Sequence, residues 1–343
     1  MSSPPIGILI VGAGFIADAH MAALAASSRA TAVGVVDSDG GRAAAFARSH
    51  GGLRYGVDLA DALGWSDVGA VIVCTPNDTH RSIGEDVAAA GKHLLVEKPL
   101  ATTVADARAL LDAFAAAGTT VMAAHTHRAY DYGRAVKEAI TEAAIGRPTL
   151  VRLAILGGWI WPDWNAWVLD PGRSGGHALH NGVHLLDLAS WWLGDTPVSV
   201  LARGAKQTSS ALPIYDYLEM LVTYAGGATA VCEMSRAHRP TSISHRDVLV
   251  FGTEGVLSHG WDDEAALLID DKGTGLVPAQ GRNGFAVQLE SWLDAIAGGS
   301  PMMATADALS AVALGVAVER SIESGEPVGL ADVLAGPDRE AVQ

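Results

Sequence analysis

The residues best suited to chemistry lie at three places along the chain. A glycine-rich turn, Gly12-Ala-Gly14-Phe-Ile-Ala17, directly follows an apolar run, and Asp37 ends the next apolar run. Lys98 closes a later apolar run, and His184 stands in a polar stripe in the second half of the chain. Backbone N–H groups at such a turn bind anions, whereas lysine and histidine side chains transfer protons. These residues predict a site that binds a phosphorylated cofactor and moves protons.

The glycine-rich turn has the spacing of a dinucleotide-binding fingerprint. Gly12 permits the tight turn, and Gly14 lets the backbone approach a pyrophosphate at the N-terminus of the following helix. Asp37 stands where an acid accepts hydrogen bonds from the ribose hydroxyls and repels a 2′-phosphate, so we predict NAD rather than NADP. Two alternatives stay open at this point: the turn is merely flexible, or Arg42 reaches the phosphate of NADP.

The first part of the chain alternates short apolar runs with Ala-rich helical stretches. The apolar runs cover residues 6–12, 30–37, 70–75, 93–98 and 120–124, and the helical stretches include residues 16–26, 78–90 and 104–117. Continuously apolar runs are typical of parallel strands that are buried on both faces. We therefore predict an α/β fold, a Rossmann domain with a doubly wound parallel sheet, over residues 1–125.

The pattern changes after residue 125. Apolar runs at 149–158, 198–205 and 217–234 follow one another without helical crossovers, and Gly226-Gly227 supplies a hairpin turn. Helices are expected over residues 285–297 and 305–324. These features predict a second, α+β domain over residues 126–343, with an open, mainly antiparallel sheet and helices on one of its faces.

The composition limits the partners. The chain has 343 residues, with 38 Asp and Glu against 23 Lys and Arg and a formal net charge of -15. Nucleic acid and anionic membrane surfaces attract basic patches, so we expect neither as a partner. Cys74 and Cys232 cannot build a disulfide framework. The first residues lack the features of a signal peptide, and no apolar run reaches about 18 residues, so we expect a cytoplasmic protein.

Three further motifs connect the sequence to a known family. Cys74-Thr75-Pro76-Asn77 and Glu97-Lys98-Pro99 each close a strand, and Gly182-Val-His184-Leu-Leu-Asp187 lies in the second half. Together with the glycine-rich turn, they resemble the glucose–fructose oxidoreductase, inositol dehydrogenase and MocA-like family over nearly the whole chain. The resemblance ends with Thr305-Ala-Asp-Ala and Gly325-Glu-Pro-Val. It implies a dehydrogenase of sugars, cyclitols and related alcohols, working as a homodimer or homotetramer, whose second domain binds substrate and forms the oligomer.

The resemblance also implies roles for single residues. Lys98 is similar to the family's active-site lysine, and His184 to its catalytic histidine. A cationic nicotinamide disfavours the ammonium form of a nearby lysine, which makes Lys98 a usable proton shuttle. His180 stands where inositol dehydrogenases usually carry Asp, which indicates a different substrate or a different division of acid–base roles. Cofactor contacts are expected from Gly12, Gly14, Phe15, Ile16, Asp37, Thr75, Pro76, Asn77, His80, Glu97 and Lys98.

The substrate half is marked by a polar stripe. Four residues are expected to share one face of a helix that begins near Gly175: His177, His180, His184 and Asp187. Polar side chains among leucines need partners, and a substrate rich in hydroxyls provides them. The spacing is also compatible with a metal, but the resemblance explains the stripe without one, so no metal is expected. Further candidate substrate contacts, with core or interface packing as their alternative role, are His125, Arg128 and Trp161.

The combined prediction is an NAD-dependent oxidoreductase that transfers a hydride between nicotinamide and a secondary alcohol of a sugar, cyclitol or glycoside. His184 would take the hydroxyl proton, assisted by Lys98 and His180. Two other functions stay open: a non-catalytic dinucleotide-binding regulator, and an oxidoreductase that recycles a tightly bound cofactor while acting at C3 of a glycoside. The retained Lys98 and His184 favour an enzyme over a regulator.

Overall fold

The computed structural model describes residues 4–158, 166–207, 210–238, 244–260, 265–278 and 281–336. The chain forms two compact units: unit 1 contains Met1–Ala101, Ala105–Ala129 and Arg282–Leu309, and unit 2 contains Thr102–Val104, Tyr130–Gly281 and Ser310–Gln343. The predicted boundary after residue 125 lies close to the division after Ala129. The assignment of 282–309 to the second domain differs from this division, because helix α9 (Gly284–Ile296) packs on helix α1 (Phe15–Ala26) of unit 1.

Unit 1 is built on a six-stranded parallel sheet with the strand order β3-β2-β1-β4-β5-β6. The strands are β1 (Ile6–Val11), β2 (Ala30–Val36), β3 (Arg54–Gly56), β4 (Ala70–Val73), β5 (His93–Glu97) and β6 (Val121–Ala124). The central strands are buried on both faces, and every residue of β4 has no exposed surface. This confirms the predicted doubly wound sheet. The short edge strand β3 escaped the sequence analysis because its residues are not apolar enough to form a run.

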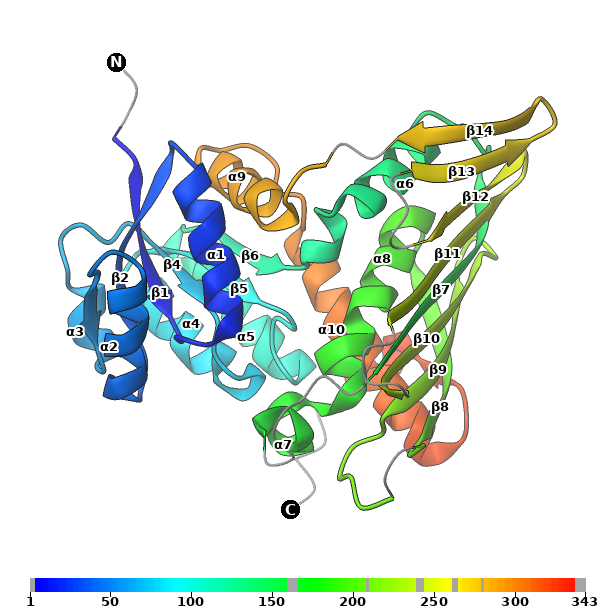
Figure 1. The fold of residues 1–343 in the computed structure, drawn as a ribbon. Coiled ribbons are helices and arrows are strands. Elements are labelled where there is room, and N and C mark those ends of the chain that lie inside the picture. The colour runs from blue at the N-terminus through cyan, green and yellow to red at the C-terminus, as the bar shows by residue number, and fades with distance from the viewer. Residues whose placement is uncertain are drawn as a thin grey trace. The chain divides into compact units, whose positions relative to one another are not determined.

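Helices cover both faces of the parallel sheet (Figure 1). Besides α1 and α9, they are α2 (Gly40–Ser49), α3 (Leu59–Leu63), α4 (His80–Ala89) and α5 (Val104–Ala117), with 3-10 turns η1 (Asn77–Thr79) and η2 (Thr126–Arg128). In Figure 1, α1 and α9 lie side by side on one face, and α4 and α5 lie on the other. The Ala-rich stretches thus form helices whose small side chains allow a close approach to the sheet. The carboxyl ends of the parallel strands are where sheets of this kind bind ligands.

Unit 2 is built on a nine-stranded sheet with the order β14-β13-β12-β11-β7-β10-β9-β8-β15. The strands are β7 (Pro148–Gly158), β8 (Pro197–Ala205), β9 (Tyr217–Tyr224), β10 (Thr229–His238), β11 (Ser244–Gly252), β12 (Gly255–Gly260), β13 (Ala265–Asp270), β14 (Gly273–Pro278) and β15 (Val328–Gly329). Among the described strand pairs of this nine-stranded sheet, only the pairing of β7 with β10 is parallel. The predicted, mainly antiparallel sheet is confirmed.

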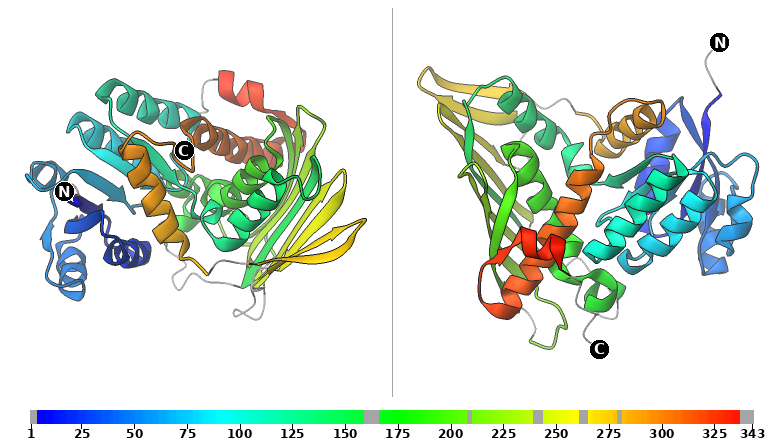
Figure 2. Two further views of the ribbon diagram at one scale, coloured as in Figure 1. Left: turned by 90° about the horizontal axis from the view of Figure 1, so that it is seen from above. Right: turned by 180° about the vertical axis from the view of Figure 1, so that it is seen from behind.

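Helices lie over one face of this sheet. They are α6 (Asp131–Thr141), α7 (Pro171–Ser174), α8 (Val183–Leu193), α10 (Thr305–Ser324) and α11 (Leu330–Ala335), with the 3-10 turn η3 (Trp167–Leu169) and the π-helical turn η4 (Ala178–Gly182). α8 packs on β7 and β10, and α6 packs on α8, as both views of Figure 2 show. In β9, buried and exposed side chains alternate along the strand. At β9, the second face of the sheet is therefore not covered by helices.

The regular helix predicted to begin near Gly175 is replaced by three shorter pieces. Gly175 and Gly176 end α7 with positive φ angles, the π-helical turn η4 follows, and only then does α8 begin at Val183. A π-helical turn holds more residues per turn than an α-helix, so it changes the angular spacing of side chains on either side. Among the described residues, no helix is long and apolar enough to cross a membrane.

Candidate functional site

The glycine-rich turn connects β1 to α1 and forms an open cradle. Gly12 has φ +93°, and a Cβ atom there would lie 2.8 Å from the carbonyl oxygen of Cys74, so only glycine fits. Gly14 is the N-cap of α1, and a Cβ atom there would meet nothing within 4 Å. No side chain caps this helix, so the N–H groups at its start have no side-chain acceptor. The cradle fits the diphosphate of a dinucleotide.

Asp37 lies beside this cradle, just after β2. Its Oδ2 accepts a hydrogen bond from Ala13 N at 2.9 Å, and its Oδ1 accepts from Asp39 N at 2.9 Å. Arg42 Nε also donates to Oδ1, at 3.2 Å. A carboxylate has about four acceptor sites, so these contacts leave about one for a ribose hydroxyl unless Arg42 moves away. Asp37 thus holds the turn and a neighbouring cation, as well as facing the expected ribose position.

Two aliphatic or aromatic residues open α1. The Phe15 side chain is 79% exposed, an unusual exposure for phenylalanine, and Ile16 is half-buried. Both stand in the first turn of the helix, and their contact with a cofactor stays a prediction.

One histidine, His80, connects the turn after β4 to the turn after β5 through hydrogen bonds. His80 is fully buried at the start of α4, with Nδ1 2.8 Å from the carbonyl oxygen of Pro99 and Nε2 3.1 Å from that of Thr75. Burial lowers the pKa of His80, although both carbonyls and Glu97 favour its charged form. The predicted cofactor residues Thr75 and Pro76 are half-buried in this turn, and Asn77 is buried. The ring of His80 is directed at protein carbonyls, and through them it fixes the two turns relative to each other.

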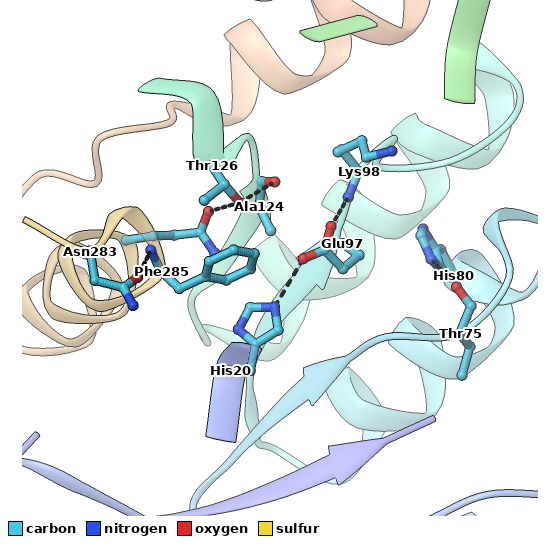
Figure 3. Close-up of polar contacts among 10 residues, drawn as sticks. His20, Thr75, His80, Glu97, Lys98, Ala124, Thr126, Asn283 and Phe285 are labelled. Carbon is cyan, nitrogen blue, oxygen red and sulfur yellow. Dashed lines mark hydrogen bonds and ion pairs between the residues drawn. The ribbon is translucent and has the colours of Figure 1, made fainter. Parts of the chain in front are cut away.

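Lys98 follows a buried ion pair at the end of β5 (Figure 3). His20 Nε2 of α1 lies 2.9 Å from Glu97 Oε1, and the backbone N–H of Lys98 donates to Glu97 Oε2 at 3.3 Å. Burial raises the pKa of Glu97, but the hydrogen bond from His20 and the nearby charge of Lys98 outweigh it, so the net shift is downward. The Lys98 side chain is half-buried and points away from the pair, and the Lys98–Pro99 peptide is cis.

The end of β6 carries two of the predicted substrate residues. His125 and Arg128 are both 2% exposed. Arg128 Nη1 donates to Asp307 Oδ2 at 2.9 Å and to the carbonyl oxygen of Met302 at 3.1 Å. These contacts tie η2 to Met302, before α10, and to Asp307 in the first turn of α10, which is the packing role that the sequence left open. Contact of either residue with a substrate stays a prediction.

The polar stripe of unit 2 is distributed over η4 and α8. His177 Nδ1 lies 2.9 Å from the carbonyl oxygen of Tyr215, and His180 is 8% exposed with its ring edge-on to Trp167, centroids 5.3 Å apart. His184 is half-buried in the first turn of α8, and Asp187 is buried. π-Helical turns are frequent at functional sites, where they re-aim side chains. Here the turn lies between His177 and His184.

A pocket in unit 2 contains two of these histidines. It is lined by Val168, His177, His180, Asn181, Leu212, Ile214, Tyr215, Asp216 and Arg236. Sequence reasoning missed Asn181, Asp216 and Arg236, because only the pairing of β9 and β10 and the turn η4 bring them together. Trp161, the predicted aromatic substrate contact, lies outside the described residues. Where the structure is described, no group of three or more His, Cys, Asp or Glu side chains is placed to hold a metal ion.

Comparison with known proteins assigns a family to this geometry. The model of an oxidoreductase family with an NAD-binding Rossmann fold, GFO/IDH/MocA, matches residues 6–125, and the C-terminal domain model of the same family matches residues 134–258. The chain belongs to this family. The predicted resemblance is confirmed, and unit 1 contains the NAD-binding Rossmann domain of an oxidoreductase.

Individual GFO/IDH/MocA proteins match over nearly the whole length. Inositol 2-dehydrogenase 2 of Paenarthrobacter aurescens strain TC1 is 30% identical over 336 residues, covering 93% of this chain and 97% of that protein. Inositol 2-dehydrogenase of Rhizobium meliloti strain 1021 is 28% identical over 334 residues, covering 94% and 98%. The solved structure of GenD2 from gentamicin A biosynthesis, in complex with NAD, is 28% identical with a TM-score of 0.83 and covers 95% and 97%. The similarity therefore includes both units.

Within this GFO/IDH/MocA oxidoreductase, the predicted cofactor residues gather at one edge of the parallel sheet. They follow β1, β2, β4 and β5, the strands on either side of the point where the strand order reverses. Open α/β sheets bind their ligands at this edge. The predicted substrate residues are divided between the units: His125 and Arg128 belong to unit 1, and His180 and His184 belong to unit 2.

Proposed function

We propose that this chain oxidises a secondary alcohol of a sugar or cyclitol with NAD, and that Lys98 and His184 handle the proton. The observation that carries the proposal is the position of Lys98 directly after β5, at the same carboxyl edge of the parallel sheet as the cradle after β1, with its backbone N–H held by Glu97. Similarity to inositol 2-dehydrogenases over 93% of the chain supports a cyclitol-like polyol as substrate.

Each residue has a defined task in this proposal. The N–H groups at Gly14 and the first turn of α1 bind the diphosphate, and Asp37 accepts a ribose hydroxyl. When bound, NAD accepts the hydride that leaves the carbinol carbon. The neutral ring of His184 takes the proton of the reacting hydroxyl, and Lys98 donates a hydrogen bond to the same oxygen as negative charge develops there. His180, earlier in the same stripe, positions a neighbouring hydroxyl.

The test is a panel of sugars and cyclitols with NAD, followed by NADH absorbance. We expect turnover of at least one member, and loss of most activity in His184→Ala together with the acid limb of the rate–pH profile, because only a neutral imidazole accepts a proton. His50→Ala is the matched control, since His50 lies at the end of α2 and is half-buried like His184.

Other outcomes would replace the proposal. NAD binding without turnover of any member would favour a regulator. Nucleotide released only on denaturation would favour a recycled cofactor. Full activity in His184→Ala, or a stoichiometric metal in elemental analysis, would overturn the assignment of His184 as the base.

We also propose that the chain forms a homodimer or homotetramer through the uncovered face of the nine-stranded sheet. Large apolar side chains are exposed on its strands: Val198, Leu201, Leu221, Phe251, Ile269 and Leu276. Leu201 and Leu221 stand opposite each other on β8 and β9. Contiguous apolar patches of this kind mark interaction sites. Light scattering should give a multiple of the monomer mass, reduced by Leu221→Arg but not by Val57→Arg in unit 1; a monomeric wild type would contradict this.

We place the protein in the cytoplasm. Cys74 and Cys232 are free, and burial raises the pKa of both thiols, which keeps them protonated and unreactive. Free cysteines suit a reducing compartment. Cell fractionation with an antibody to the native protein tests this location, and recovery in a secreted fraction would contradict it.

A further inference from the structure

One arginine lines the pocket in unit 2 and has no role in the proposed polyol oxidation. Arg236 stands near the end of β10 and lines the pocket together with His177 and His180. Its backbone N–H is tied to the carbonyl oxygen of Asp216 at 3.2 Å, so the position of the residue is fixed by the sheet. Arg236 therefore lines the same pocket as His177 and His180.

The Arg236 guanidinium has few hydrogen-bond partners among the described residues. Its one side-chain hydrogen bond among the described residues is long, 3.4 Å from Nη2 to Asn181 Oδ1, and its buried Nε has no partner there. No carboxylate of the described part of the chain forms an ion pair with it. Arg236 is half-buried, so its guanidinium has lost part of its hydration without gaining a carboxylate partner among the described residues. Loss of hydration without a counter-ion disfavours the charged form, and an anionic ligand would offset that loss.

A second arginine adds to the positive charge. Arg246 of β11 is close enough to repel Arg236, and burial together with this repulsion lowers the pKa of Arg236 to about 10. Arg236 therefore stays cationic at neutral pH. Asp216 also lines the pocket, but its Oδ1 accepts the backbone N–H of Gln207 at 2.7 Å. A ligand carboxylate would give Arg236 the ion pair that it lacks among the described residues.

We propose that Arg236 binds a carboxylate of the substrate, which makes the substrate an acid derivative of a sugar or cyclitol. The inference rests on the proposed polyol oxidation, whose substrate it narrows. A guanidinium presents its N–H groups in a planar fork that matches a carboxylate in two parallel hydrogen bonds. Apolar Val168, Leu212 and Ile214 complete the pocket wall, which suits a flat group better than a hydrated phosphate.

The experiment compares matched acids and neutral sugars in the wild type and in Arg236→Gln. The pairs are D-glucuronate with D-glucose and D-galacturonate with D-galactose, with D-glucose 6-phosphate as a tetrahedral anion. We expect the wild type to favour the acids by about tenfold or more in kcat/KM, as for a charge-assisted pair. In Arg236→Gln the ratio of acid to neutral activity should fall toward one. Arg203→Gln, on the exposed face of β8, is the control and should keep the ratio.

Binding is measured separately from turnover, by the change in Tm that each compound causes. A carboxylate that raises Tm in the wild type but not in Arg236→Gln, without NADH formation, would support the subsite and contradict the proposed dehydrogenation. Preference for neutral sugars or for the phosphate, no Tm change with any acid, or an acid preference that survives Arg236→Gln would overturn the subsite. If Arg236→Gln does not fold, Arg236→Lys keeps the charge, removes the fork and should show an intermediate ratio.

Discussion

The two units hold their functional groups in different ways. In unit 1 the cofactor side is built from backbone amides, carbonyls and closed polar pairs, such as Asp37 with Ala13 N and His20 with Glu97. In unit 2 the proposed substrate pocket is built mainly from side chains, including those of η4 and β10, and Arg236 there has few protein partners. We expect the first arrangement to suit a constant ligand and the second to suit a variable one.

This difference predicts that the cofactor cradle tolerates fewer substitutions than the pocket of unit 2. A backbone cradle depends on glycine at Gly12 and on an acid at Asp37, so few sequences satisfy it. A side-chain pocket can exchange one residue without disturbing its neighbours. His180, in the position where related enzymes are expected to carry Asp, is such an exchange, and Arg236 is a second candidate.

Lys98→Ala should give the largest effect, because it removes the group of unit 1 that we propose handles the proton. We expect kcat to fall roughly a hundredfold or more while NAD affinity changes only a few-fold, as for an acid–base group. Initial rates and NAD titration measure the two quantities. Lys272→Ala, an exposed lysine in the turn between β13 and β14, should leave both unchanged. Unchanged kcat in Lys98→Ala would make Lys98 a structural residue.

Asp37→Ala tests whether the cofactor cradle of unit 1 depends on an acid at this position. The variant loses the acceptor for Ala13 N and releases Arg42, which lies 3.2 Å from the carboxylate. NAD binding should weaken, and discrimination against NADP should fall, by about 1–3 kcal/mol. Adding Arg42→Ala should remove any gain in NADP affinity. Direct titration of both cofactors measures this, and a wild type that prefers NADP would contradict the role of Asp37.

The cofactor side was largely predictable from sequence because it depends on short motifs with fixed spacing. The turn at Gly12, the acid at Asp37 and the lysine before Pro99 all stand where the parallel sheet brings strand ends together. Each of these features requires only local sequence and the handedness of the crossovers.

The substrate side was less predictable because its residues meet only through tertiary pairing. Arg236 joins the histidines through the pairing of β10 with β7 and β9, and no local pattern marks it. The π-helical turn at 178–182 was predicted as regular helix, since the sequence shows no signal for the extra residue. The inclusion of α9 in unit 1 was also missed, because helical periodicity does not tell which sheet a helix covers.

His20→Ala tests the closed pair that precedes Lys98. The variant leaves the Glu97 carboxylate buried without its imidazole partner, so we expect a loss of about 1–2 kcal/mol in the free energy of unfolding. The pKa of Glu97 is lowered in the folded protein, so the pair stabilises above the ordinary value of 4.5 and this stability is lost as pH falls through the folded value. Urea unfolding at neutral and acidic pH should therefore show a difference between variant and wild type that shrinks on acidification.

His20→Gln is the conservative control, because its amide N–H can still donate to Glu97. It should recover part of the lost stability, whereas equal stability of wild type and His20→Ala at neutral pH would contradict the pair. Phe285 packs edge-on against His20, with ring centroids 5.1 Å apart, so Phe285→Leu separates the packing contribution from the ionic one.

The smallest effect concerns the support of the histidine stripe in unit 2. Glu319 of α10 accepts the backbone N–H of Ala178, the first residue of η4, at 3.0 Å, and burial raises the pKa of its carboxyl to about 7. The folded protein therefore binds this proton more tightly than the unfolded chain does, and the free energy of unfolding should fall as pH rises from about 4.5 through about 7. Glu319→Gln removes that slope and should be more stable than the wild type at about pH 8, by roughly 1–2 kcal/mol, but not at about pH 5. Glu323→Gln, which removes a neighbouring negative charge, should reduce the slope slightly, and equal slopes in the wild type and Glu319→Gln would contradict the assignment.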